Sequence, residues 1–139
     1  MNSFQKILVP VDGSKASFKA LDRALILAGF TNAETTVLHV IPHVPEGGPR
    51  TTSFDKEIVR HGKEILEKAA KISKKKRRKL KTKLVRGSPS LETVKAAKNG
   101  KFDHIVMSST GTGSTEKEML GSVSNFVVHK SKVPIYLIK

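Results

Sequence analysis

The feature that most constrains the fold is an alternation between short apolar runs and longer segments with helical spacing of their apolar residues. Apolar runs of strand length are separated each time by ten or more residues, and glycine, proline or serine marks most of the boundaries. The pattern predicts five strands and four helices. The strands are expected at 6–11, 34–41, 80–85, 103–107 and 133–138, and the helices at about 14–29, 52–72, 88–99 and 122–130.

Such an alternation is typical of an α/β fold, in which a parallel sheet carries helices on both faces and every crossover is right-handed. With 139 residues, the chain has room for one domain, 1–139. The third strand is short and alternates polar with apolar residues, which suits a sheet edge. We therefore expect an open five-stranded sheet of order 3-2-1-4-5, in preference to 2-1-3-4-5.

The helical segments also predict which side chains face the core. In the second helix, Phe54, Ile58, Ile65, Ala69 and Ile72 recur on one stripe, and Gly62 falls on the same stripe, where a small residue permits close packing.

In the third helix the spacing points Leu91 and Val94 inward, with Ser88 as its N-cap and Asn99-Gly100 as its stop. Gly29 is expected to end the first helix, as glycine commonly does.

Charge is distributed unevenly. Against 26 Lys and Arg stand 12 Asp and Glu, a formal net charge of +14, and ten of the basic residues lie between Lys71 and Arg86 with no acid among them. One interpretation is a contact with a polyanion, meaning nucleic acid, an anionic membrane or an acidic partner. The other, which we favour at this stage, is a solvated connection between the second helix and the third strand.

Composition excludes several classes of function. The chain has no Cys, which rules out disulfides, thiolate metal sites and thiol nucleophiles. With no Trp and one Tyr, a stacking platform for single-stranded nucleic acid is not expected. The first residues lack the pattern of a signal peptide, and no apolar stretch is long enough to span a bilayer, so we expect a cytoplasmic location and no membrane insertion.

Two loops flank the point where a 3-2-1-4-5 sheet reverses its winding, which is where open α/β sheets bind ligands. They are Asp12-Gly13-Ser14 and the Gly-, Ser- and Thr-rich segment from Ser108 to Ser122. In the second loop, Gly121-Ser122 opens a helix whose first N–H groups form an anion seat that suits a phosphate. The loop contains no Walker pattern and only the beginning of a dinucleotide fingerprint.

Taken together, these residues resemble the universal stress protein family. The family carries an Asp-Gly-Ser-like turn after the first strand and a Gly-x-x-Gly-x9-Gly-Ser/Thr loop after the fourth. Here Gly111, nine residues and Gly121-Ser122 match that loop, while Ser108 stands where the first glycine would fall. Further matches are spread over nearly the whole chain: Ile7 to Ser14, Leu38-His39-Val40, Val85 to Pro89, Asp103 to Met107, Gly121-Ser122-Val123 and Val133-Pro134-Ile135.

The resemblance implies a Rossmann-like, adenine nucleotide alpha hydrolase-like fold and a site for ATP or AMP, to which Mg²⁺ would come with the nucleotide. By position, Pro10 and Asp12 would lie at the sugar–adenine end, the Val40 backbone at the adenine edge and Ser108 near the ribose. The phosphates would be held by the loop glycines and the start of the last helix: Gly111, Gly121, Ser122 and Val123. The function implied is that of a ligand-responsive binding module in stress response.

A homodimer is expected on two grounds. The last strand, from Val133 to Ile138, is an apolar sheet edge that invites pairing with a second chain. The resemblance agrees, because universal stress proteins commonly pair their last strands in antiparallel fashion. The expected interface is symmetric and isologous.

Simpler interpretations remain beside these. Asp12 is as well suited to cap the first helix as to contact a ligand, Gly121-Ser122 alone is an ordinary helix start, and His39 reads as a satisfied core or rim histidine. No protein-held metal and no catalytic residue are assigned, so enzymatic activity stays open, with a binding role favoured over weak ATP hydrolysis. The alternative function is the same fold without nucleotide, acting as a protein- or polyanion-interaction module through 71–86.

Overall fold

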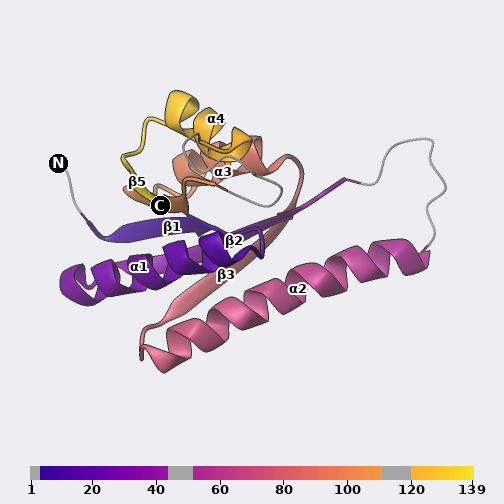
Figure 1. Ribbon diagram of the computed structural model, residues 1–139, viewed down its shortest axis with the longest axis horizontal. Helices are drawn as coiled ribbons and strands as arrows, with labels where there is room; N and C mark the ends of the chain where they lie inside the picture. Colours follow the sequence, from indigo (N-terminus) through magenta and orange to yellow (C-terminus); the bar gives the residue numbers. More distant parts are fainter. Residues whose placement is uncertain (1–3, 44–51, 111–119) are drawn as a thin grey trace.

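The computed structural model describes residues 4–43, 52–110 and 120–139, with the backbone alone at 52 and 53. Its centre is a five-stranded sheet, all of whose neighbouring strands run parallel (Figure 1). The order is β3-β2-β1-β4-β5, which confirms the prediction. The strands are β1 (Lys6–Pro10), β2 (Glu34–Ile41), β3 (Leu80–Arg86), β4 (His104–Ser108) and β5 (Ile135–Ile138).

Within the described residues, two helices cover each face of the sheet. They are α1 (Lys15–Thr31), α2 (Thr52–Lys75), α3 (Pro89–Asn99) and α4 (Ser122–Lys130). Along β1, the fully buried Ile7 and Val9 belong to the core formed with α1 and α2, whereas Leu8 belongs to the core with α3 and α4. Successive side chains of a strand point to opposite faces, so an unbroken apolar run such as β1 is what a doubly covered sheet requires.

Gly62 brings α2 close to the sheet, as its place on the apolar stripe predicts. A methyl group at this position would lie 2.9 Å from Cγ2 of Ile41 and 3.0 Å from Cδ1 of Leu84. Both distances are shorter than an ordinary van der Waals contact, so the helix backbone itself packs against β2 and β3. This approach places the amino-terminal half of α2 beside the carboxyl ends of those strands.

Of the two helix stops predicted from the sequence, the one at Gly29 is wrong and the one at Asn99-Gly100 is confirmed. Gly29 does not end α1, which continues to Thr31 and closes at Asn32 with φ 59°. Helix α3 ends at Asn99 with Gly100 as its C-cap; Gly100 has an ordinary φ of −84°, and the left-handed residue is Lys101. Asn tolerates the left-handed region better than most residues do, which explains how α1 can pass Gly29 and end at Thr31 with Asn32 as its cap.

Two apolar side chains expected in the core are exposed instead. Phe54 is 58% exposed and Leu91 57% exposed. In α3 the buried side chains are Thr93 and Ala97, and the Thr93 hydroxyl donates to the carbonyl of Pro89 one turn earlier (2.7 Å). A threonine whose hydroxyl is hydrogen-bonded within its own helix can face the core. A prediction that assigns only apolar residues to the core misses such a residue.

A carboxylate ties the start of β1 to the start of β4. Oδ2 of Asp103 accepts the backbone N–H groups of Gln5 (2.9 Å) and Lys6 (3.0 Å), and Oδ1 lies 2.9 Å from Nδ1 of His104. Burial raises the pKa of Asp103, but the hydrogen bonds from His104, Gln5 and Lys6 outweigh it and hold the pKa below its ordinary value. The folded state therefore favours the ionised carboxyl.

Asp103→Asn is expected to lower stability by about 1 kcal/mol at neutral pH, because the charge-assisted hydrogen bonds weaken. A carboxyl whose pKa is depressed on folding stabilises the native state above its unfolded pKa, and this contribution is lost as the pH falls. The difference in Tm between wild type and Asp103→Asn should therefore narrow as the pH falls below about 4. Thermal melts at pH 7 and pH 3 measure it, and a gap of equal size at both would contradict the ionic origin.

Candidate functional site

The sheet parts at its carboxyl end between β1 and β4. Their paired register covers Ile7 with His104 and Leu8 with Ile105, after which β1 continues to Pro10 and β4 to Ser108. The winding of the sheet reverses at the same place, because β1 leads to β2 on one side while β4 leads to β5 on the other. The ends of β1 and β4 therefore meet at the topological switch point, which is the position of the ligand crevice in open α/β sheets.

The turn after β1 is shaped by Asp12 and Gly13. Oδ1 of Asp12 accepts the backbone N–H of Ser14 at 2.8 Å, and Gly13 has φ +91°, a conformation that favours glycine. The cap of α1 is Ser14, whose hydroxyl accepts the N–H of Ser17 at 3.1 Å. Asp12 thus does not cap the helix itself, as one interpretation had it; it forms the turn that precedes the cap, and its side chain is exposed.

The backbone of Val40 faces the crevice. In β2, the carbonyl of Leu38 accepts the N–H of Val11 on the β1 side, and the carbonyl of Ile41 accepts the N–H of Gly87 on the β3 side. Peptide groups alternate sides along a strand, so Val40 presents its N–H and C=O toward β1. Since β1 ends at Pro10, opposite Leu38, these groups lie beyond the last paired residue of β1.

The start of α4 is fastened to the end of β4. The N–H of Gly121 donates to the carbonyl of Ser109 at 2.8 Å, and the buried hydroxyl of Ser124 donates to the same carbonyl at 2.8 Å. The Gly121 N–H is therefore already hydrogen-bonded within the protein. The next amides, of Ser122 and Val123, belong to the first turn of α4 and have no acceptor within the helix.

The remaining candidates have separate positions. Ser108 ends β4 with only 9% of its surface exposed, and its hydroxyl donates to the carbonyl of Thr110. Gly111 lies outside the described residues. Ser122 is exposed at the amino-terminal end of α4, whereas the side chain of Val123 packs against the core that the sheet forms with α3 and α4.

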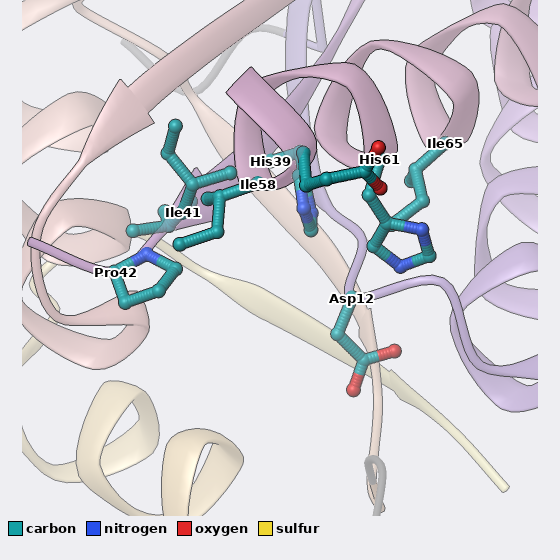
Figure 2. Close-up of a pocket in the computed structure, with 9 residues that line it drawn as sticks. Asp12, His39, Ile41, Pro42, Ile58, His61 and Ile65 are labelled. Atoms are coloured by element: carbon teal, nitrogen blue, oxygen red, sulfur yellow. The ribbon is translucent and has the colours of Figure 1, made fainter. Parts of the chain in front are cut away.

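A pocket of about 360 Å³ opens between the ends of β1 and β2 and the first half of α2 (Figure 2). Its volume is within the range of small-molecule sites. Of the predicted site residues, Asp12 and Val40 line it. Its other lining residues are His39, Ile41, Pro42, Glu57, Ile58, His61 and Ile65.

Two histidines give this pocket a polar wall. His39 is 8% exposed, and its Nδ1 lies 2.7 Å from the carbonyl of Val11, which fixes the proton on Nδ1 because a carbonyl only accepts. Its interpretation as a satisfied histidine at the rim of the core is confirmed. His61 comes from α2 and lines the same pocket as Asp12 (Figure 2). Glu57 is held ionised, since the hydrogen bond and charge of Arg60 lower its pKa.

The contribution of α2 was not anticipated from the sequence. The signal that points to it is Gly62, because a helix that packs by its backbone at position 62 brings positions 58, 61 and 65 to the strand ends. Within the residues that the structure describes, no group of three His, Cys, Asp or Glu side chains comes together as a metal site. No helix in the same residues is long and apolar enough to cross a membrane.

Together, the parallel sheet, its helices on both faces and the crevice at the switch point define a Rossmann-like α/β protein. The chain belongs to the universal stress protein family, since the model of the Universal stress protein family matches residues 3–139. Universal stress protein MJ0531 of Methanocaldococcus jannaschii is 32% identical over 142 residues, which cover 99% of this chain and 84% of that protein.

Solved structures of other members of the family have the same fold. Protein MJ0577 of Methanocaldococcus jannaschii superposes with a TM-score of 0.79 at 32% identity, covering 98% of this chain and 96% of that one. A universal stress protein solved in complex with cAMP gives a TM-score of 0.79 at 25% identity, covering 99% of this chain and 98% of that one. The fold predicted from the sequence is thereby confirmed.

Proposed function

We propose that this universal stress protein binds an adenine nucleotide, ATP or AMP, in the crevice between β1 and β4. The observation that carries the proposal is the parting of these two strands directly beside the first turn of α4. A helix N-terminus attracts a phosphate through its N–H groups and its dipole. Support from a relative comes from the universal stress protein that was solved with cAMP.

In this proposal the adenine lies toward the Val40 backbone, whose N–H and C=O offer one donor and one acceptor beyond the end of β1. Pro10 and Asp12 border the sugar, and Ser108 lies near the ribose. The amides of Ser122 and Val123, with Gly111 from the loop, hold the phosphates, and Mg²⁺ enters only with the nucleotide. In this proposal Gly121 holds the helix start in place, since its N–H donates to the carbonyl of Ser109.

The proposed module is a cytoplasmic homodimer that responds to its ligand in the stress response, without a catalytic residue of its own. The β5 strand is one edge of the sheet, and the exposed side chain of Tyr136 lies on it. An edge strand offers unpaired N–H and C=O groups to a second copy. Antiparallel pairing of two β5 strands would give a closed dimer with an isologous interface.

Calorimetric titration of the wild-type protein with ATP, AMP and GTP tests the proposal, with the mass of the same sample measured by sedimentation equilibrium. We expect saturable heat with one site per chain for an adenine nucleotide, weaker binding of GTP, and the mass of a dimer. Absence of heat with both adenine nucleotides would remove the nucleotide claim and leave the alternative of an interaction module. A monomer mass would remove the dimer claim independently.

A further inference from the structure

The end of the sheet opposite the crevice collects lysine and arginine residues from three connections. Each helix runs antiparallel to the strands, so the links from α2 to β3, from α3 to β4 and from α4 to β5 all lie at the amino end of the sheet. Figure 1 shows the first of them, where α2 turns into β3. We call the following exposed residues the basic edge: Lys74, Lys75, Arg77, Lys79, Lys98, Lys101, Lys130 and Lys132.

The acidic residues near this end are already engaged. Asp22 pairs with Lys76 at 2.7 Å, Glu34 pairs with Lys81 at 3.2 Å, and Asp103 accepts the hydrogen bonds described above. None of the eight side chains of the basic edge forms an ion pair within the described part of the chain. The edge therefore carries a positive charge that the protein itself does not neutralise.

The turn between α2 and β3 is held in a fixed shape. Nη2 of Arg78 donates to the carbonyl of Ala28 at the end of α1 (2.8 Å), and the N–H of Arg78 donates to the carbonyl of Ser73 (3.0 Å). Arg77 closes the helix with φ 56°. Arg78 and Lys76 thus fasten the turn to α1, and the neighbouring cations project from a backbone that is already ordered.

The arrangement suits an extended polyanion. Neighbouring strands are about 4.8 Å apart, so the edge from β3 to β5 spans about 19 Å. A nucleic acid duplex carries one negative charge per about 1.7 Å of axis, or about 11 charges over that length. A bilayer fits less well, because the exposed apolar side chains at this end, Phe30 (86%) and Val128 (38%), lie on α1 and α4, on opposite faces of the sheet.

We infer that the basic edge binds the phosphate backbone of a nucleic acid duplex without reading its sequence. This function is additional to the proposed nucleotide site and lies at the other end of the sheet. Cations in the last turn of a helix are also favourable for the helix alone, through its dipole. The inference therefore requires that lysines at the basic edge contribute more to duplex binding than the same number of exposed lysines elsewhere on the surface.

The experiment measures anisotropy of a labelled 30-base-pair DNA duplex with the 139-residue protein across a range of KCl concentrations. Lys74, Lys75 and Lys79 are changed together to Gln, and the matched control changes Lys56, Lys63 and Lys95 to Gln. The control removes three exposed lysines from the outer surface of α2 and α3, away from the edge. Tm values of all three proteins, measured in parallel, report whether the variants are folded.

We expect the logarithm of the association constant to fall linearly with the logarithm of salt concentration. Each phosphate contact contributes about −0.9 to this slope. Removal of three lysines should therefore make the slope shallower by up to about 2.7 and lower the affinity at low salt at least about tenfold. The control variant should keep most of the wild-type slope, and two duplexes of unrelated sequence should bind within about twofold.

Four results would overturn the inference. They are no DNA binding by folded wild-type protein at low salt, an equal loss in the edge and control variants, a tenfold preference for one duplex sequence, or tighter binding to phosphatidylserine vesicles than to DNA. Phe30→Ala adds a check, because bilayer insertion would depend on this exposed ring and backbone binding to a duplex would not. Nucleotide titration uses no residue of the edge, so failure here leaves the proposed function standing.

Discussion

Ser122→Glu is expected to abolish adenine nucleotide binding while leaving the fold as stable as before. Ser122 is the first residue of α4, exposed at the mouth of the crevice. A carboxylate in the first turn complements the helix dipole and stabilises the helix by about 0.3–1 kcal/mol. The same carboxylate occupies the proposed phosphate seat and repels the ligand, and like charges brought together cost several kcal/mol. We expect the Kd for ATP to rise at least about 100-fold, with an unchanged or higher Tm.

Ser90→Glu is the matched control. Ser90 lies in the first turn of α3, which follows β3 at the far edge of the sheet, two strands from the crevice. The substitution makes the same change of side chain and net charge at another helix start. ATP titrations of the two variants and thermal melts compare them directly. If Ser122→Glu binds ATP as tightly as Ser90→Glu does, the phosphates are held somewhere other than the start of α4.

The architecture was predictable because the continuous apolar runs of the strands differ strongly from the three- and four-residue spacing of apolar residues in the helices. The strand Glu34–Ile41 and the helix Ser122–Lys130 have the expected bounds. The exposure of Phe54 has a geometric cause that periodicity does not contain. Helix α2 has 24 residues and is about 36 Å long, whereas the eight residues of β2 extend about 27 Å. Its first turns therefore reach past the sheet, so an apolar side chain there lies beyond the core that the sheet forms with α1 and α2.

The candidate site was predictable where it depends on strand ends and less so where it depends on packing. Topology alone brings Asp12, Val40 and Ser108 to the same edge of the sheet. The engagement of the Gly121 amide by Ser109 is a contact between two segments, and no spacing in the sequence encodes it. The same holds for His61, which reaches the pocket because α2 approaches the strands at Gly62.

Gly62→Leu is expected to destabilise the protein by about 2–3 kcal/mol and lower Tm by about 10 °C. The space beside Gly62 is filled by Ile41, Leu84 and His39, with the ring carbon Cδ2 of His39 only 3.3 Å from where a methyl group would lie. A leucine there must push α2 away from β2 and β3. Because the same helix forms one wall of the pocket, ligand binding should weaken as well.

Gly29→Leu makes the matched comparison, since Gly29 also lies within a helix and is replaced by the same side chain. A methyl group at Gly29 would meet no atom within 4 Å. Leucine has a higher helix propensity than glycine, by up to about 0.8 kcal/mol, so this variant should be slightly more stable than wild type. Chemical denaturation of both variants measures the two free energies of unfolding. If close packing determines which side chains position 62 tolerates, the free energy of unfolding must fall in Gly62→Leu and rise in Gly29→Leu. A gain in stability in both variants would show that α2 does not pack against the sheet through Gly62.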